Sequence, residues 1–540
     1  MKKKLIGLFL IIVIIKIILT IFITSPSIFA DEYVYLKGAR SFFTEGSFNI
    51  YDGHKSSYPP LYYIIISISY LLKDATLIYL TIKIINALII SAIIFPSYLL
   101  AKEFLEQKDA LVTAILISLL PANFGFNNYI MSENIYYLLF LIYIYLFYKA
   151  LKTNEKKYYL FTGIIIGLSL LTRSVSSIMI LITIVTVIIN NLKKRNIIQI
   201  KNTILALLIT SIIYIPYSMT KQSLFPGYEV VLQNNSPTII AVTSFFIWSI
   251  FYTAIIILST GIIGSIPIIP KIKEIKEKHP LMANLFYTTI ILTVFLVAYY
   301  ALTTNVKAES ILSFLKGRPI GRYIDYILPL IVIMTIIAAK LKPIITLKQS
   351  ALVYFILVLS TPIVFFQLFP LNNISTSWIG TIRFMLGKQT IPITIMIFSV
   401  IYLIMVSIAH KITNKQKVIS FLFIFFITIN ILNFSLIYQN SKIWSNSEQF
   451  KLGKWINNNI QEQTTFLIDQ DSCTSADFKN SDASLGPPPF CKWTKVGIWI
   501  NNKLIVDKVN TAKPHEYIIT KQKLDKILIK NFGTTYLYKN

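Results

Sequence analysis

Apolar and polar segments alternate along most of the chain, and the apolar segments are long. Runs of roughly 18 to 25 apolar residues recur, and each is long enough to cross about 30 Å of hydrocarbon as a helix. Read in order, the apolar segments predict about 13 membrane spans. The predicted spans are residues 5–24, 76–100, 110–121, 135–150, 159–172, 174–190, 202–218, 239–262, 281–302, 324–339, 350–370, 389–409 and 418–438.

Composition separates this chain from soluble proteins. Of its 540 residues, 55% are hydrophobic and only 14% are charged, which is far from the usage of a soluble domain. The net charge of +27 is typical of loops that face the cytoplasm and anionic lipid, and is weak evidence for nucleic-acid binding. We therefore expect an all-α, multi-pass protein whose partners include membrane lipids and exclude nucleic acid.

The charges of the loops predict an orientation. If the N-terminal "MKKK" is cytoplasmic, every second connection should be cytoplasmic too, and each of these is short and basic. The opposite connections are longer and contain aromatic residues, Asn, Pro and acids. This pattern predicts a cell-membrane protein with a cytoplasmic N-terminus and an extracytoplasmic C-terminus. It also requires a break at Arg173, because one unbroken helix there would invert every later loop.

The last hundred residues differ from the rest, since they are polar and contain no run that can span. We predict a membrane domain over 1–438 and a small extracytoplasmic α/β domain over 439–540. An amphipathic helix should begin this domain, with Ser445 and Glu448 at capping-box spacing. A hairpin is expected at 501–502. The predicted strands are "TTFLID", "GIWI", "KLIVDK", "EYIIT" and "TYLYK".

The two cysteines of the chain, Cys473 and Cys491, both lie in this predicted domain. An oxidising exterior would allow a disulfide, and closing a loop of this size stabilises a protein by roughly 3 kcal/mol. Two unpaired thiols are the alternative. Their spacing does not match a metal-binding motif.

The first external loop opens with two adjacent carboxylates, Asp31 and Glu32. The sequence "DEYVYLKGARSFF" predicts an interfacial helix, and Tyr58 before two prolines predicts an extended entry to a second one. The preceding apolar run is longer than the roughly 7 to 15 residues of a signal-peptide core, although "SIFA" leaves cleavage before Asp31 open. Asp31 either faces a cavity at the membrane surface or caps its helix.

Other ionisable residues also lie on the predicted outer side. Glu133 begins the fourth span, where Ser132 could cap the helix, so a structural role is as well supported as a functional one. Arg318 and Arg322 stand where positive charge is normally sparse. Their guanidinium groups match the oxygens of a phosphate, with contact to anionic lipid headgroups as the alternative. Arg173 is a further candidate for a phosphate contact, with weaker support than Arg318 and Arg322.

Five short motifs carry a resemblance to a known family. They are "ADEYVYLKGA", "YPPLYYI", "MSENIYYLLF", "GLSLLTRSVSS" and "GRYIDYILPL". Over roughly residues 1–440, their order and membrane side resemble the GT-C membrane glycosyltransferases. The similarity is greatest to the protein mannosyltransferases and aminoarabinose lipid A transferases, which use polyprenyl-phosphate sugars. The resemblance implies a polyprenyl- or dolichyl-phosphate sugar as donor and a protein or lipid as acceptor.

The resemblance also implies roles for individual residues. Asp31 would be the catalytic Asp of the first loop, and Arg318 or Arg322 would contact the donor phosphate. This chain departs from the aminoarabinose transferases at Tyr58, where they carry a Lys before the loop proline; Lys55 is the available substitute. The candidate substrate-binding residues are Glu32, Lys55, Tyr58, Glu133, Arg173, Arg318, Arg322 and Tyr323.

The expected chemistry needs few groups. A sugar on a polyprenyl phosphate is already activated, so transfer requires a base for the acceptor proton and positive charge for the departing phosphate. In-line attack would invert the anomeric carbon. We expect no cofactor or metal, because the donor carries a single phosphate, and the sequence has no phosphate-binding glycine loop of the Walker type.

Two other functions remain open. A lipid-linked polysaccharide polymerase or ligase would share the donor and the external site. A transporter or flippase of lipid-linked sugars would also have many spans, but that class typically shows internal repeats and ionisable residues near the midplane. Here the candidate acids lie at one surface, and the clear midspan charges are Lys16 and Lys83.

Overall fold

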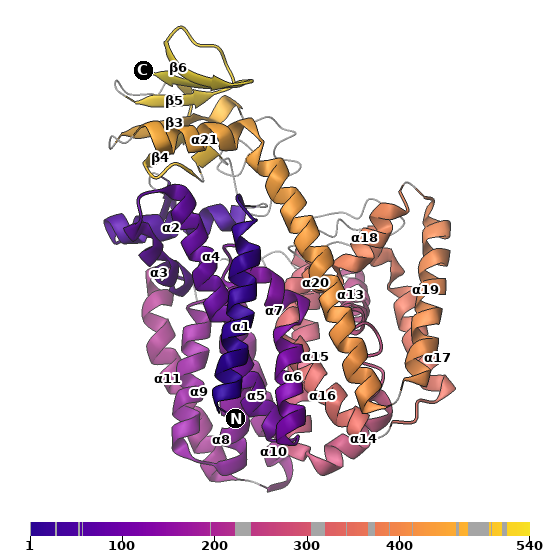
Figure 1. Cartoon of the computed structure of the whole chain (residues 1–540). Helices are drawn as coiled ribbons and strands as arrows, with labels where there is room; N and C mark the ends of the chain where they lie inside the picture. The colour runs from indigo at the N-terminus through magenta and orange to yellow at the C-terminus, as the bar shows by residue number, and fades with distance from the viewer. Residues whose placement is uncertain are drawn as a thin grey trace. The chain divides into compact units, whose positions relative to one another are not determined.

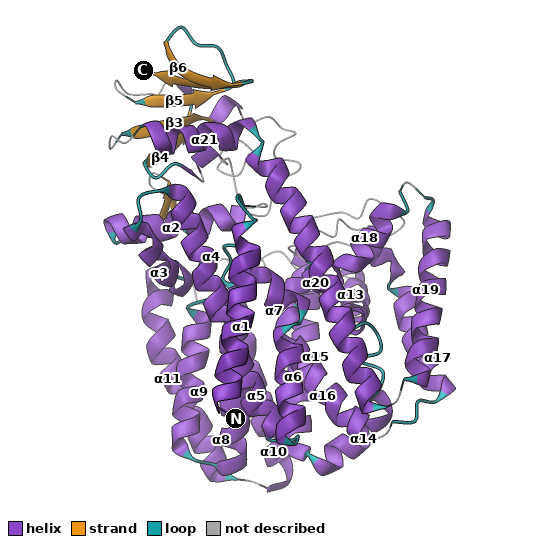
Figure 2. Cartoon of the chain, viewed as in Figure 1, coloured by secondary structure: helices purple, strands orange, loops and turns teal. Residues whose placement is uncertain are grey.

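The computed structural model of the chain is mostly helical, with a small group of strands near the C-terminus (Figure 2). The predicted fold class, a multi-pass helical membrane protein with a small C-terminal α/β region, is confirmed. The structure describes residues 2–26, 30–51, 54–56, 58–194, 196–221, 239–303, 319–341, 343–365, 373–387, 389–412, 414–460, 464–472, 496–497, 499–509 and 516–540.

Helices follow one another along nearly the whole described chain (Figure 1). They are α1 (Lys2–Ile21), α2 (Ala30–Glu45), α3 (Leu61–Ser67), α4 (Ala75–Ser91), α5 (Ile94–Lys102), α6 (Gln107–Ser118), α7 (Pro121–Gly125), α8 (Glu133–Thr153), α9 (Lys156–Leu170), α10 (Ser177–Lys194), α11 (Ile197–Lys221), α13 (Ile239–Ser259), α14 (Ile268–Lys278), α15 (Pro280–Thr303), α16 (Leu328–Lys340), α17 (Leu347–Leu359), α18 (Ser377–Met385), α19 (Ile391–Lys411), α20 (Lys415–Ser445) and α21 (Glu448–Asn459).

Fewer helices meet the length and composition expected of a membrane span than the 13 that were predicted. Within the described ranges, 10 helices are long and apolar enough to cross a membrane, or 11 if the bent pair α6 and α7 is one span. The predicted count of 13 is not confirmed. The difference lies in α6, α9 and α16, whose 12, 15 and 13 residues fall short of the roughly 20 that a bilayer requires.

The chain divides into two compact units. Unit 1 comprises Met1–Val13, Ile89–Phe126 and Glu133–Ser435. Unit 2 comprises Ile14–Leu88, Asn127–Ser132 and Leu436–Asn540. Unit 2 therefore combines the loop between α1 and α4 (the first loop) with the C-terminal segment. The boundary between 438 and 439 as the edge of an independently folding domain stays a prediction.

In unit 1, the chain breaks at Arg173 as the loop charges predicted. Helix α9 ends at Leu170, Arg173 is extended with φ −153°, and a 3-10 turn at Ser174–Ser176 leads into α10. The carbonyl of Ser169 holds this turn, because it accepts hydrogen bonds from the Arg173 amide at 2.8 Å and the Ser176 hydroxyl at 2.7 Å. A polar corner between two apolar helices is the result.

In unit 2, the first loop contains both predicted helices. Helix α2 carries Asp31 and Glu32 in its first turn, where the helix dipole favours negative charge. A short antiparallel pair, β1 (Asn49–Tyr51) and β2 (His54–Lys55), precedes α3. Helices α2 and α3 pack closely at Gly38, since a Cβ there would lie 2.5 Å from the ring of Tyr63.

The C-terminal sheet of unit 2 is mixed. Its strand order is β4-β3-β5-β7-β6, with β4, β3 and β5 parallel and β5, β7 and β6 antiparallel. Buried Leu467, Ile518 and Tyr538 form its core. The strands are β3 (Thr465–Asp469), β4 (Lys503–Asp507), β5 (Tyr517–Thr520), β6 (Ile527–Phe532) and β7 (Thr535–Lys539).

Some details predicted for this region were wrong. Residues 501–502 do not turn a hairpin, because β4 pairs with β3 in parallel, and the described residues of "GIWI" form a 3-10 turn with no strand. The sequence analysis missed β6; its hairpin with β7 turns at Gly533, whose φ of +55° suits glycine. The N-cap of α21 is Ser447, since α20 continues through Ser445.

Candidate functional site

The two adjacent carboxylates of α2 have different partners within unit 2. Asp31 is 9% exposed, and its Oδ1 accepts a hydrogen bond of 2.7 Å from the Tyr58 hydroxyl. Glu32 is fully buried, and its Oε1 accepts from the backbone amide of Ile130 at 3.1 Å. Adjacent helical side chains point about 100° apart, which explains the different surroundings. Glu32 joins α2 to residues 127–132, whereas Asp31 is joined to the loop before α3.

Tyr58 is placed by its local sequence. The Ser56 hydroxyl accepts a hydrogen bond from the Tyr58 amide at 3.0 Å, and Pro59 follows. Burial and the negative charge of Asp31 hold the pKa of Tyr58 well above its ordinary value. The phenol therefore stays protonated and remains a hydrogen-bond donor to the carboxylate. Lys55, the predicted substitute, has its backbone in β2; its side chain lies outside what the structure describes.

Tyr58, the partner of this carboxylate, belongs to a group of tyrosines that was not predicted from the sequence. The ring of Tyr35 lies 5.4 Å from that of Tyr58, 4.9 Å from Tyr62 and 5.2 Å from Tyr63. The Tyr62 hydroxyl donates to Asn86 at 3.0 Å. The repeated tyrosines of "YPPLYY" were the available signal. They make an aromatic wall with polar edges beside Asp31.

The midspan charge Lys83 has a structural role in unit 2. It is 1% exposed, and its Nζ donates to the carbonyls of Thr20, at 3.1 Å, and Ile23. These carbonyls lie at the C-terminal end of α1, where backbone oxygens lack helical partners. The ammonium also stands 4.3 Å from the ring centroid of Tyr79.

In unit 1, Glu133 lies between two arginines. Its side chain is 1% exposed, and its Oε1 forms ion pairs with Nη1 of Arg173 and, at 3.6 Å, with Nε of Arg322. Both guanidinium groups stand over the ring of Tyr323, 5.4 and 5.6 Å from its centroid. The structure therefore brings together four predicted residues that are up to 190 positions apart in sequence, from Glu133 to Tyr323.

The loop that carries Arg322 is held by buried polar contacts. The Gly321 amide donates to Asn373 Oδ1 at 3.0 Å, and the Tyr137 hydroxyl donates to the Arg322 carbonyl at 2.9 Å. Asp325, 2% exposed, lies three residues further on and interacts electrostatically with Glu133. The sequence analysis missed Asp325 because it assigned the residue to the apolar span 324–339.

Three predicted residues lie outside the described ranges: Arg318, Cys473 and Cys491. The predicted disulfide therefore stays a prediction. Among the residues that the structure does describe, no group of three or more His, Cys, Asp or Glu side chains could hold a metal ion.

Residues 57–219 match the sequence model of the dolichyl-phosphate-mannose-protein mannosyltransferase family. A comparison with curated proteins finds no match. Among solved structures, ArnT from Cupriavidus metallidurans in the apo state has a TM-score of 0.59 at 12% identity, covering 99% of this chain and 98% of ArnT. The chain has the GT-C fold.

Two further solved structures are similar to this chain. ArnT from the same organism bound to undecaprenyl phosphate has a TM-score of 0.55 at 13% identity, covering 93% of this chain and 85% of ArnT. The apo oligosaccharyltransferase of Archaeoglobus fulgidus has a TM-score of 0.46 at 11% identity, covering 93% of this chain and 65% of its own. The resemblance expected from the motifs is confirmed, in fold over nearly the whole chain and in sequence over residues 57–219.

Proposed function

We propose that this chain is an integral membrane glycosyltransferase that moves a sugar from a polyprenyl-phosphate donor to a protein or lipid acceptor on the outer side of the membrane. The observation that carries the proposal is the buried cluster of Glu133, Arg173 and Arg322. Burying charged groups in a membrane protein is costly, and such groups are usually functional. The GT-C fold, shared with a protein bound to undecaprenyl phosphate, supports the donor class.

In this proposal, Arg322 and Arg173 stabilise the donor phosphate. Both guanidinium groups meet at one buried carboxylate, so the cluster gathers two cationic side chains in one place. Guanidinium donors match phosphate oxygens in geometry. Their stabilisation grows as the sugar–phosphate bond breaks, because negative charge then develops on the leaving group. Arg318 remains a further candidate for the same role.

Asp31 is the proposed base. Its carboxylate takes the proton from the acceptor hydroxyl, the acceptor oxygen bonds to the anomeric carbon, and polyprenyl phosphate leaves with the electrons of the broken bond. Attack opposite the leaving group gives inversion. The hydrogen bond from Tyr58 supports this role, since a protonated donor keeps Asp31 ionised and oriented. The proposed reaction uses no cofactor and no metal.

A release assay tests the proposal. Purified protein in detergent solution is given polyprenyl-phosphate sugars with and without acceptor extracts, and free polyprenyl phosphate is measured by chromatography. We expect acceptor-dependent release, which Asp31→Asn abolishes. A transporter or flippase would release nothing, because its product differs from its substrate only in membrane side. Mass analysis of the product distinguishes one added sugar from the longer glycan of a polymerase or ligase.

A further inference from the structure

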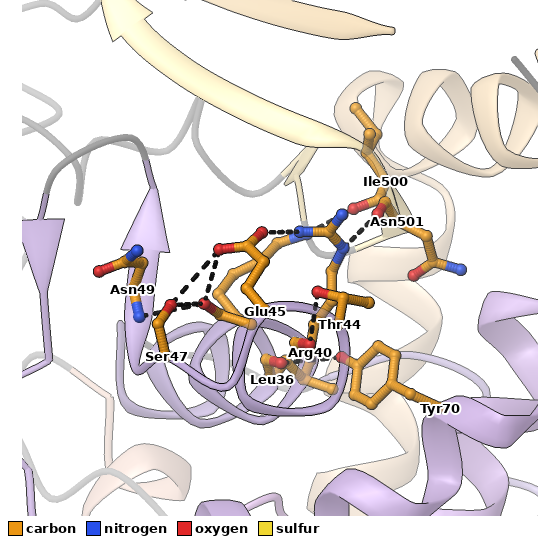
Figure 3. A network of polar contacts seen from close by, with 11 residues as sticks. Leu36, Arg40, Thr44, Glu45, Ser47, Asn49, Tyr70, Ile500 and Asn501 are labelled. Atoms are coloured by element: carbon orange, nitrogen blue, oxygen red, sulfur yellow. Dashed lines mark hydrogen bonds and ion pairs between the residues drawn. The ribbon is translucent and has the colours of Figure 1, made fainter. Parts of the chain in front are cut away.

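Two basic side chains of α2, Lys37 and Arg40, connect this helix to the C-terminal segment of unit 2. Lys37 and Arg40 lie one helical turn apart, on the same face of α2. Lys37 Nζ donates to the carbonyl of Ile500, and Arg40 Nε donates to the carbonyl of Asn501. Figure 3 shows the guanidinium of Arg40 reaching the carbonyl of Asn501. The acceptors are 463 and 461 residues away in sequence.

The burial of Lys37 shows how closely the two segments pack. Lys37 is only 5% exposed. Such burial is rare for a lysine unless its amine is paired. Burial, and then the neighbouring charge of Arg40, lower the pKa of Lys37. The carbonyl of Ile500 is the hydrogen-bond acceptor that this buried amine uses.

Asn501 ties the same segment to two other elements. Its Nδ2 donates to the carbonyl of Lys73 at 3.0 Å and to Oδ1 of Asn457 in α21 at 3.2 Å. Helix α2 has a further contact of its own, because the Tyr70 hydroxyl donates to the carbonyl of Leu36 in α2 at 2.8 Å. The contact with α2 is thus part of a network and does not depend on one side chain.

Aromatic packing completes the contact. Trp499 is 1% exposed, and its ring lies 5.8 Å from that of Tyr79 in α4 and 6.0 Å from that of Phe450 in α21. At Gly497 a Cβ would lie 3.2 Å from the ring of Tyr33 in α2. We call Gly497, Trp499, Ile500 and Asn501 the clamp segment.

We propose that the clamp segment positions α2, and through it Asp31, for the transfer reaction. Lys37 and Arg40 are then positioning residues, which act through the helix without touching substrate. Asp31 lies six residues before Lys37 on the same helix, about 9 Å along its axis, so a shift of α2 at the clamp moves the carboxylate. The inference rests on the proposed function of Asp31.

Hydrogen exchange and kinetics of the full-length protein test the inference. Arg40→Gln removes the side chain that donates to the Asn501 carbonyl. Asn501→Ala keeps that carbonyl but removes the two hydrogen bonds from the Asn501 side chain to Lys73 and Asn457. We expect amides of α2 to exchange at least ~10-fold faster in both variants. We also expect kcat to fall roughly 10-fold at unchanged KM for the donor, because donor binding does not require an aligned base. Arg40→Lys should recover part of the loss.

Glu45→Gln is the matched control. It removes the 3.8 Å ion pair between Glu45 and Arg40 inside α2 but leaves the contact with Asn501. Exchange of α2 and kcat should stay within twofold of the wild type. Unchanged exchange of α8 in every variant shows that the rest of the chain is folded.

The outcomes separate this inference from the proposed function. Unchanged exchange of α2 in Arg40→Gln and in Asn501→Ala overturns the clamp, whatever the activity. Faster exchange with unchanged kcat overturns its positioning role, while loss of transfer in Asp31→Asn still supports the proposed function. If Arg40→Gln does not fold, Asn501→Ala alone decides, since it leaves α2 itself unaltered.

Discussion

Asp31 and Glu32 are neighbours in sequence, yet the first accepts from Tyr58 and the second from a backbone amide. If Asp31 is the base and Glu32 is not, the chemical step should need the negative charge of Asp31 more than that of Glu32. We expect Asp31→Asn to lower transfer by at least ~100-fold, while expression and donor binding persist. Glu32→Gln should be milder. The release assay with the two variants side by side makes the measurement; full activity of Asp31→Asn would mean that this residue only caps α2.

Tyr58→Phe tests the hydrogen bond to the proposed base. A donor to a carboxylate favours its charged form and lowers its pKa. Removing the donor therefore raises the pKa of Asp31, and the acidic limb of the kcat/KM profile should move to higher pH by about one unit. Activity lost at low pH should return at high pH.

Tyr70→Phe provides the comparison for this variant. Its hydroxyl donates to the Leu36 carbonyl in the same loop. The acidic limb should not move in Tyr70→Phe. An unmoved limb in Tyr58→Phe would show that Asp31 is not the group that titrates in kcat/KM.

Arg322→Ala should raise the apparent KM for the polyprenyl-phosphate sugar and lower kcat, because the charge of the phosphate grows as its bond breaks. We expect kcat/KM to fall roughly 100-fold. Arg322→Lys should recover only part, since an ammonium cannot reproduce the guanidinium fork. Arg383→Ala, in α18, serves as the control. Wild-type kinetics in both Arg322 variants would remove this residue from the phosphate site.

Single residues were predictable where charge stood out against its surroundings. Asp31, Glu133 and Arg322 could be chosen because ionisable groups at the predicted outer ends of apolar runs are few. Asp325 could not, because it merges into an apolar run. The pairing of Glu133 with Arg173 was also out of reach, since no local pattern reports contacts between segments so far apart in sequence.

Helix packing at the element scale depends on small residues. At Gly163 in α9, a Cβ would lie 2.3 Å from the backbone oxygen of Ala206 in α11, and small residues allow such close approach in membranes. Gly163→Ala should force the helices apart and lower the free energy of unfolding by about 1–3 kcal/mol. Gly7→Ala, with no atom within 4 Å of its Cβ, should leave stability unchanged or slightly higher. Thermal unfolding in detergent measures both; equal losses would contradict the packing argument.

Elements were predictable where a pattern repeats and uncertain where it is short. Long apolar helices such as α15 and α19 agree with their predicted spans, because many residues contribute to each assignment. The strand β6 was missed because exposed Ile527 and Leu528 are followed by Lys530 and Asn531, which breaks the expected alternation. Pairing between β3 and β4 depends on which segments meet, and no local sequence determines that.

At the scale of the whole molecule, the main prediction still to be tested is that the C-terminal segment lies on the extracytoplasmic side of the membrane. Cys473 and Cys491 are the only cysteines, so labelling reports on the C-terminal segment alone. A membrane-impermeant maleimide should fail on intact cells until a reductant is added, and then label both residues. Labelling without reductant would show an outer segment with unpaired thiols. Labelling only after the membrane is broken would place the segment in the cytoplasm.

Unit 2 is built from the first part of the chain and the last. Ser25 donates to the carbonyl of Ser441 at 2.7 Å across 416 residues, and Arg40 reaches Asn501 across 461. Ribosomes add about 5–20 residues per second, so roughly 20 to 90 s pass between the synthesis of Arg40 and that of its partner. During this time the nascent first loop lacks its contacts with Ile500 and Asn501. A premature stop codon after residue 445 would thus remove the acceptors of Lys37 and Arg40, and the first loop would never acquire these contacts.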